Sequence, residues 1–164
     1  MKIKYLYWFA GLLIALLLIF GTEPEQKNTT VSYTAYNDTD IGIVAIAING
    51  KGGVLDAAPH QGGGEVCCVA IPKKWTPGLK AKIQWEEDGD WLRDEKGNVI
   101  FDQARGHIYI PKPWREREVE IPRYGEELGT FQIYFLPQDD IKVAVFDGNY
   151  YEPSHPFHRF APPK

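Results

Sequence analysis

The strongest constraint on the fold is the strict alternation of apolar and polar side chains in residues 79–85. In this segment, LKAKIQW, every second residue is apolar, and the residues between them are lysine or glutamine. Successive side chains of a β-strand point to opposite faces of a sheet. The pattern therefore predicts a strand with one face in a core and the other in solvent.

Further strands are predicted along the chain after residue 30. Residues 31–36 show the same alternation, and residues 41–48 are apolar on both faces, which favours a central strand. Asn49-Gly50 follows directly and is a typical turn sequence. Additional strands are expected at residues 66–71, 107–110, 117–121, 130–136 and 141–146. Proline and glycine residues separate them, including Pro77 and Gly78.

These features place the chain in the all-β class. The 12 prolines, the 16 glycines and the lack of an amphipathic helical pattern after residue 21 predict an antiparallel β-sandwich or a partly open barrel of about eight strands. The chain, with 164 residues of which 44% are apolar, fits one globular core. We expect one β domain at 30–148 after a polar tether at 22–29. A proline-rich tail at 149–164 follows, and its aromatic residues favour packing on the domain surface.

Residues 5–21 form an uncharged apolar run that predicts one N-terminal hydrophobic helix. Its 17 residues would span about 26 Å of a hydrocarbon layer about 30 Å thick. Lys2 and Lys4 precede the run, which predicts export of the rest of the chain. Segment 1–21 is a membrane anchor or a signal segment. The poor cleavage pattern before residue 22 favours the anchor.

Charge and motifs exclude several function classes. The net charge of −4, without a cluster of basic residues, argues against a nucleic-acid partner. Neither serine of the chain lies in a nucleophile elbow, and the acidic runs do not have calcium-loop spacing. His155 and His158 are interpreted as exposed tail histidines rather than as metal ligands. We therefore predict a protein that is not an enzyme and has no cofactor and no metal site.

The adjacent cysteines Cys67 and Cys68 allow three interpretations. On a strand their side chains diverge, so both could be small buried hydrophobic residues. In an oxidising compartment they could form a disulfide between neighbours, which would stiffen the loop beside the glycines. Metal binding is the third interpretation. The preceding glycines, Gly62, Gly63 and Gly64, are expected to form a flexible turn or a close backbone approach.

Tryptophan residues beside basic residues mark a candidate partner surface. Trp75, Trp91 and Trp114 lie at predicted turns. Tryptophan and arginine are enriched where protein interfaces bind most strongly. The predicted partner-binding residues are Trp75, Trp91, Trp114, Arg115, Lys73 and Lys74. In the alternative interpretation, the tryptophans close the ends of the sandwich.

Three segments resemble the bacterial envelope proteins grouped as domain of unknown function 3304. They are "VSYTAYNDTDIGIVAIAINGKGG", "GGGEVCCVAIPKKWTPGLKAKIQWE" and "EPSHP". The motifs Y-N-x-T, N-G-x-G-G, C-C, P-x-K-W-x-P-G-L and S-H-P cover most of residues 31–156. Members are commonly lipoproteins or singly anchored proteins. This chain lacks a cysteine that could accept a lipid after residue 21, so the resemblance implies attachment through the N-terminal segment.

The resemblance also implies a function. Some relatives are similar to immunity proteins encoded beside type VI secretion phospholipase effectors. The expected function is a non-enzymatic protein that binds and neutralises such a toxin. It would be a single-pass protein of the bacterial inner membrane with its C-terminal domain in the periplasm, or it would be released there after signal cleavage. The alternative is a structural or glycan-binding (peptidoglycan-binding) module of the cell envelope.

Overall fold

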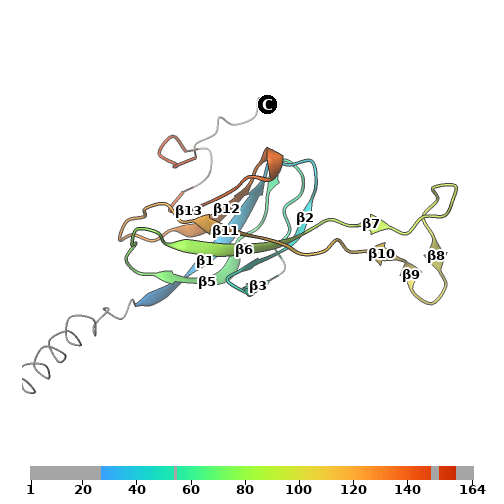
Figure 1. Cartoon of the computed structure of the whole chain (residues 1–164), viewed down its shortest axis with the longest axis horizontal. Coiled ribbons are helices and arrows are strands. Elements are labelled where there is room, and N and C mark those ends of the chain that lie inside the picture. Colours follow the sequence, from blue (N-terminus) through green and yellow to red (C-terminus); the bar gives the residue numbers. More distant parts are fainter. Residues whose placement is uncertain (1–26, 54, 149–151, 158–164) are drawn as a thin grey trace, which may run out of the picture.

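The computed structural model describes residues 27–53, 55–148 and 152–157 (Figure 1). The predicted N-terminal helix lies outside the described residues, as does the tail apart from residues 152–157. Within the described ranges no helix is long and apolar enough to cross a membrane. These ranges contain strands and one short 3-10 helix, η1 (Pro137–Asp139), so the all-β class is confirmed.

The described strands form two main sheets, which together we call the body. The first sheet has the order β13 (Ile141–Phe146), β12 (Thr130–Phe135), β1 (Asn28–Asn37) and β4 (Gln61–Gly62), and β5 (Val66–Pro72) also pairs with β1. The second has the order β11 (Arg115–Glu120), β6 (Lys80–Glu87), β2 (Ile43–Ile48) and β3 (Lys51–Gly53). Neither sheet closes into a barrel.

Both sheets contribute to one buried apolar cluster. Tyr33 and Phe131 come from the first sheet, and Ile83 and Trp85 come from the second. Burial of this apolar area from water is the main driving force for a fold of this kind. The alternation predicted for residues 79–85 is confirmed, because the apolar residues Ala81, Ile83 and Trp85 of β6 are buried while Lys80 and Lys82 are exposed.

Three details of the strand prediction are wrong. The described residues contain thirteen strands rather than about eight, because several short pairs of two or three residues carry no alternation that a sequence can show. The predicted strand at 107–110 is split between β9 (Gly106–His107) and β10 (Tyr109–Ile110). The fold is also not purely antiparallel, because β1 and β12 pair in parallel, with Tyr33 opposite Phe131. No hairpin turn connects these two strands, so local sequence does not set their direction.

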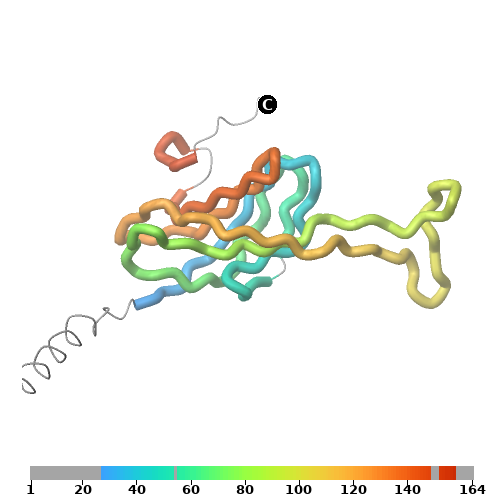
Figure 2. Tube along the Cα trace, in the orientation of Figure 1, coloured from blue at the N-terminus to red at the C-terminus, as the bar shows by residue number. Residues whose placement is uncertain are grey.

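Residues 88–114 leave the body between β6 and β11 as a long projection, which we call the arm (Figure 2). Its shaft contains β7 (Asp90–Trp91), paired with β10, and its tip contains β8 (Phe101–Asp102), paired with β9. No residue of the arm is fully buried. The arm therefore has no core of its own.

The described part of the tail, residues 152–157, packs against the outer face of the first sheet. His155 is only 4% exposed, and its ring contacts Phe146 and Tyr134. The expectation that the tail packs on the domain holds for this segment. The interpretation of His155 as an exposed histidine is wrong, because Gln132 and Tyr134 of β12 supply buried polar partners. His158 lies outside the described residues.

Candidate partner-binding site

The shaft of the arm is a narrow two-stranded ribbon. Tyr109 lies opposite Trp91, and Ile110 lies opposite Asp90. Beyond this pair, the main-chain N–H of Leu92 donates a hydrogen bond to the carbonyl oxygen of Ile108 at 2.8 Å. Because β7 and β10 pair only with each other among the described strands, each has one edge open to solvent. Open edges are able to pair with another chain.

The tip of the arm divides into two polar turns. In the first, Asp94 accepts hydrogen bonds from the main-chain N–H groups of Lys96 and Asn98 and from the Asn98 side chain. The bonds from Asn98 hold the pKa of Asp94 below its ordinary value. In the second turn, Oδ1 of Asp102 accepts from the N–H groups of Ala104 and Arg105, each at 2.8 Å. Both turns are thus ordered by an aspartate that satisfies main-chain donors.

Four aromatic side chains run along the arm in contact with one another, and we call them the aromatic strip: Tyr109, Trp91, His107 and Phe101. The ring centroids of Trp91 lie 5.4 Å from Tyr109 and 5.9 Å from His107, and those of His107 and Phe101 lie 5.2 Å apart. All three contacts are edge-to-face, an arrangement that aromatic rings prefer. Trp91 is 47% exposed and Phe101 is 63% exposed. The strip is ordered by its own contacts and still accessible.

Exposed hydrophobic side chains are concentrated on the arm and are rare on the body. Six large hydrophobic side chains are exposed in the described part of the chain, and Ile41 alone belongs to the body. The other five lie in the arm: Trp91, Phe101, Tyr109, Ile110 and Trp114. Exposed apolar patches of this kind mark interaction sites more often than isolated residues do.

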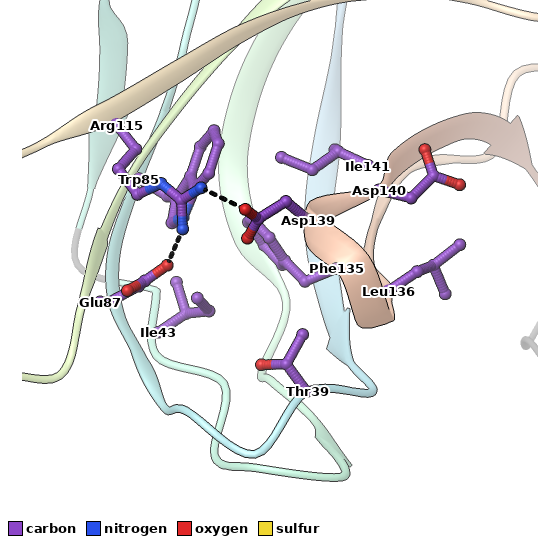
Figure 3. A pocket seen from close by; sticks show the side chains of 10 residues that line it. All are labelled: Thr39, Ile43, Trp85, Glu87, Arg115, Phe135, Leu136, Asp139, Asp140 and Ile141. Carbon is purple, nitrogen blue, oxygen red and sulfur yellow. Dashed lines mark hydrogen bonds and ion pairs between the residues drawn. The ribbon is translucent and has the colours of Figure 1, made fainter.

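Arg115 joins the root of the arm to the body, where a small pocket lies (Figure 3). Its guanidinium donates a hydrogen bond to Glu87 at the end of β6, and its Nη2 lies 3.0 Å from Oδ2 of Asp139 in η1. The same group lies over the ring of Trp85, 5.1 Å from its centroid. The root is therefore held by contacts with β6 of the second sheet and with η1, which connects β12 and β13 of the first sheet.

The charges at the root stabilise one another. Hydrogen bonds to Asp139 and Glu87 raise the pKa of the Arg115 guanidinium. The hydrogen bond from Arg115, together with its positive charge, lowers the pKa of Asp139. Slightly further out, the hydroxyl of Tyr109 accepts from the N–H of Gly89 at 2.6 Å and donates to Asp88 at 3.0 Å. These bonds tie the first residues of the two limbs together.

The predicted partner-binding residues do not form one surface. Trp91 and Trp114 are exposed on the arm, and Arg115 lies at its root. Trp75 lies between β5 and β6, at the opposite end of β6 from the arm, where exposed Lys73 and Lys74 precede it. The Trp75 ring packs against the core and its Nε1–H donates to the carbonyl oxygen of Ile121 at 2.8 Å. Its surroundings match the alternative in which tryptophan closes an end of the fold.

Sequence reasoning missed Phe101, His107, Tyr109 and Ile110 as members of this site. The sequence predicts the segment HIYI as an ordinary strand of the domain. One signal could have separated this segment from the strands of the body: charged, turn-forming segments flank it, DEKGN and DQARG on one side and PKP on the other. A short strand isolated in this way has little chance of entering a larger sheet.

The double cysteine is a disulfide on the surface. Cys67 and Cys68 are bonded to each other, and both residues are exposed. Val69 pairs with Val31 and Val66 pairs with Tyr33, so the two cysteines form an irregularity opposite Ser32. Such an irregularity lets residues leave the ladder without ending the strand. The interpretation as buried hydrophobic residues is therefore wrong, and the disulfide interpretation agrees with the structure.

The glycines and the turn around this motif have distinct roles. Gly63 donates its N–H to the carbonyl oxygen of Ala35 at 2.7 Å, and a Cβ there would lie 2.4 Å from the carbonyl oxygen of Asp56. This is the close backbone approach expected for the glycine run. Gly62 pairs with Tyr36 in the first sheet, whereas a Cβ added at Gly64 would meet no described atom within 4 Å. Gly78, after Pro77, has a φ of +78°, a turn conformation that favours glycine.

The described residues also bear on metal binding. No group of three or more histidine, cysteine, aspartate or glutamate residues within the described ranges is arranged to hold a metal ion.

In structural terms the chain is an all-β protein whose arm carries the exposed aromatic strip. Its family follows from comparison: residues 36–143 match the family described as "protein of unknown function (DUF3304)", and the chain belongs to that family. No curated protein and no solved structure matches the chain.

Proposed function

We propose that this protein acts by binding a protein partner through its arm and that it is not an enzyme. The aromatic strip carries the proposal. Trp91 contacts Tyr109 directly and is linked to Phe101 through the ring of His107, on a projection that nothing else in the described structure covers. Tryptophan and tyrosine are the residues that most often dominate binding energy at protein interfaces.

The expected gain from such a contact is substantial. Full burial of one large apolar side chain contributes about 1.5–3 kcal/mol. The rings of the strip already contact one another, and such contacts reduce the side-chain entropy that is lost when a partner covers them. A partner that encloses two or three of these rings therefore gains enough to set the affinity of the complex.

The partner class comes from the family resemblance. We propose a phospholipase-type toxin delivered by type VI secretion, which this protein neutralises as an immunity protein. In this proposal residues 1–21 anchor the chain in the inner membrane, or are cleaved, and the β domain lies in the periplasm. The exposed disulfide between Cys67 and Cys68 supports an oxidising compartment, because such bonds persist there and are rare in the cytosol.

The test combines co-purification with protection of cells. The full chain should co-purify with the phospholipase effector encoded beside it, and cells that make it should survive that effector. The double substitution Trp91→Ala, Phe101→Ala should weaken binding at least 10-fold, whereas Ile41→Ala, at the exposed apolar residue of the body, should bind as the wild type does. A wild-type chain that neither binds nor protects would overturn the proposal.

A second candidate is a glycan-binding module of the cell envelope, and the exposed ring of Trp91 is the observation that favours it. Aromatic faces of this kind stack on sugar rings. This alternative predicts saturable binding of soluble peptidoglycan fragments that Trp91→Ala abolishes and Trp75→Ala leaves intact in a folded protein. If the fragments do not bind, the alternative is excluded.

A further inference from the structure

The arm presents apolar side chains on both of its faces. Trp91 and Tyr109 are opposite each other and share one face. Because side chains alternate along a strand, Leu92, Ile108 and Ile110 lie on the other face. Ile110 is 47% exposed, as much as Trp91. A partner with a flat surface could cover only one of these faces.

The two turns of the tip differ in character from the shaft, whereas Phe101 of β8, between them, continues the aromatic strip. The turns, residues 94–98 and 102–105, are polar or charged apart from Gly97 and Ala104. The whole arm contains five carboxylates and four basic side chains. The carboxylates are Asp88, Asp90, Asp94, Glu95 and Asp102, and the basic residues are Arg93, Lys96, Arg105 and Lys112. The net charge of the arm is therefore close to zero, and carboxylates outnumber basic side chains in the two turns of its tip. This composition opposes insertion into an anionic lipid surface, which attracts basic segments.

The shaft is long and narrow enough to enter another protein. Its first limb, residues 88–92, extends about 16 Å if each residue of a strand adds about 3.3 Å. A two-stranded ribbon of this kind is only marginally stable in water by itself. A partner that surrounded the shaft could pair with the main-chain groups of its open edges and bury the apolar side chains of both faces.

We infer that the arm inserts into a cleft of its partner, with apolar walls against both faces of the shaft and against Phe101, and with polar groups of the partner facing the two turns of the tip. This inference rests on the proposed function for the identity of the partner. A phospholipase must hold acyl chains in an apolar cleft next to polar catalytic groups, which matches the shaft and the tip in turn. The arm thereby occupies the site that a substrate chain needs. It inhibits the enzyme directly and does not merely keep it away from the membrane.

The first experiment compares two substrates of the effector in the presence of the purified full chain. One is a short-chain, water-soluble nitrophenyl ester, and the other is a phosphatidylglycerol-phosphatidylethanolamine vesicle. Occupation of the cleft should inhibit hydrolysis of both substrates with the same inhibition constant, and inhibition of the ester should be competitive. If the effector binds but still hydrolyses the ester at its full rate, cleft insertion is wrong while the proposed function survives.

The second experiment tests whether both faces are enclosed. Trp91→Asp and Ile110→Asp place a charge on opposite faces of the shaft, and Ile41→Asp is the matched control on the body. Enclosure predicts that each arm substitution raises the Kd for the effector at least 10-fold and that the control leaves it unchanged. If only one face matters, the arm lies on a surface and is not in a cleft. Since no arm residue is fully buried and Ile41 is itself exposed, urea unfolding should show an intact body in all three variants.

Discussion

Trp75 and Trp114 differ in what surrounds their indole rings. Trp75 packs against the buried cluster of the body, and its Nε1–H is bonded to Ile121. Trp114 is 52% exposed at the root of the arm, next to Arg115. The same residue type is thus part of the core at one site and part of an accessible surface at the other. The two sites should respond differently to truncation.

We expect Trp75→Ala to lower the free energy of unfolding by about 2–4 kcal/mol, because it removes core packing and leaves the Ile121 carbonyl without its donor. Trp114→Ala should change it by less than about 0.5 kcal/mol, as is usual for an exposed side chain. Urea unfolding followed by far-UV circular dichroism measures both. Equal effects would show that the assignment of Trp75 to the core is mistaken.

At the scale of elements, the arm depends on a connection that is made outside it. Arg115 begins β11 and contacts Glu87 at the end of β6 as well as Asp139 in η1. The connection therefore links the two strands that lead into the arm with the turn between β12 and β13. A fixed root limits the directions that the arm can take. This order before binding favours affinity.

The Arg115–Asp139 contact predicts a pH dependence of stability. Arg115 lowers the pKa of Asp139 below its ordinary value of 3.8 in the folded protein. A carboxylate with a lowered pKa stabilises the fold above its unfolded pKa, and that stability is lost as the pH falls through the folded pKa. The wild type should therefore be more stable than Asp139→Asn at pH 7, and the difference should shrink below about pH 4.

Urea titrations of both proteins between pH 7 and pH 3 provide this measurement. In an Arg115→Ala background the difference between aspartate and asparagine at position 139 should be much smaller at every pH. A difference that stayed constant as the pH fell would mean that the contact does not depend on the charge of Asp139.

For the whole molecule, the segment 152–157 extends the domain beyond its two sheets. The main-chain N–H of Phe157 donates to Nδ1 of His155 at 2.9 Å. Nε2 of the same ring lies 3.1 Å from Oε1 of Gln132 and 2.5 Å from the Tyr134 hydroxyl. Gln132 also donates to the carbonyl oxygen of Gly148 at 2.7 Å. One histidine therefore connects the tail segment with the middle of β12.

Loss of this ring should destabilise the whole domain. We expect His155→Ala to lower the free energy of unfolding by about 2–3 kcal/mol, because Gln132 and Tyr134, both buried, each lose a hydrogen-bond partner. His60→Ala is the matched control. His60 pairs with Asp40 at the surface, and exposed pairs contribute about 0–1 kcal/mol. Chemical unfolding of the wild type and the two variants at pH 7 measures these differences. Similar free energies of unfolding for both variants would contradict the role assigned to His155.

Much of the body could be predicted from the sequence, because the patterns that identify its strands lie in neighbouring residues. The alternation in residues 79–85 identified β6 and its buried face, and the same reasoning located β1, β5, β12 and β13 to within a few residues. The motifs at 31–156 also indicated the family, which the match at 36–143 confirms. In each case the evidence lies in neighbouring residues, and strand formation depends on the same neighbours.

The arm, the parallel pairing and the buried tail histidine were decided only by tertiary structure. Nothing near Tyr33 in the sequence specifies Phe131 as its partner, and nothing near His155 specifies Gln132. For the candidate site, Trp91 and Trp114 were predicted because tryptophan is enriched at protein interfaces, and the structure places both of them on the arm. Phe101, His107 and Tyr109 were missed because strand periodicity does not distinguish a ribbon in solvent from a strand in a sheet. The sequence alone determined which segments are extended and which of their faces are apolar, because both follow from adjacent residues. Which of those faces are covered depends on contacts between distant segments, and only the folded chain makes them.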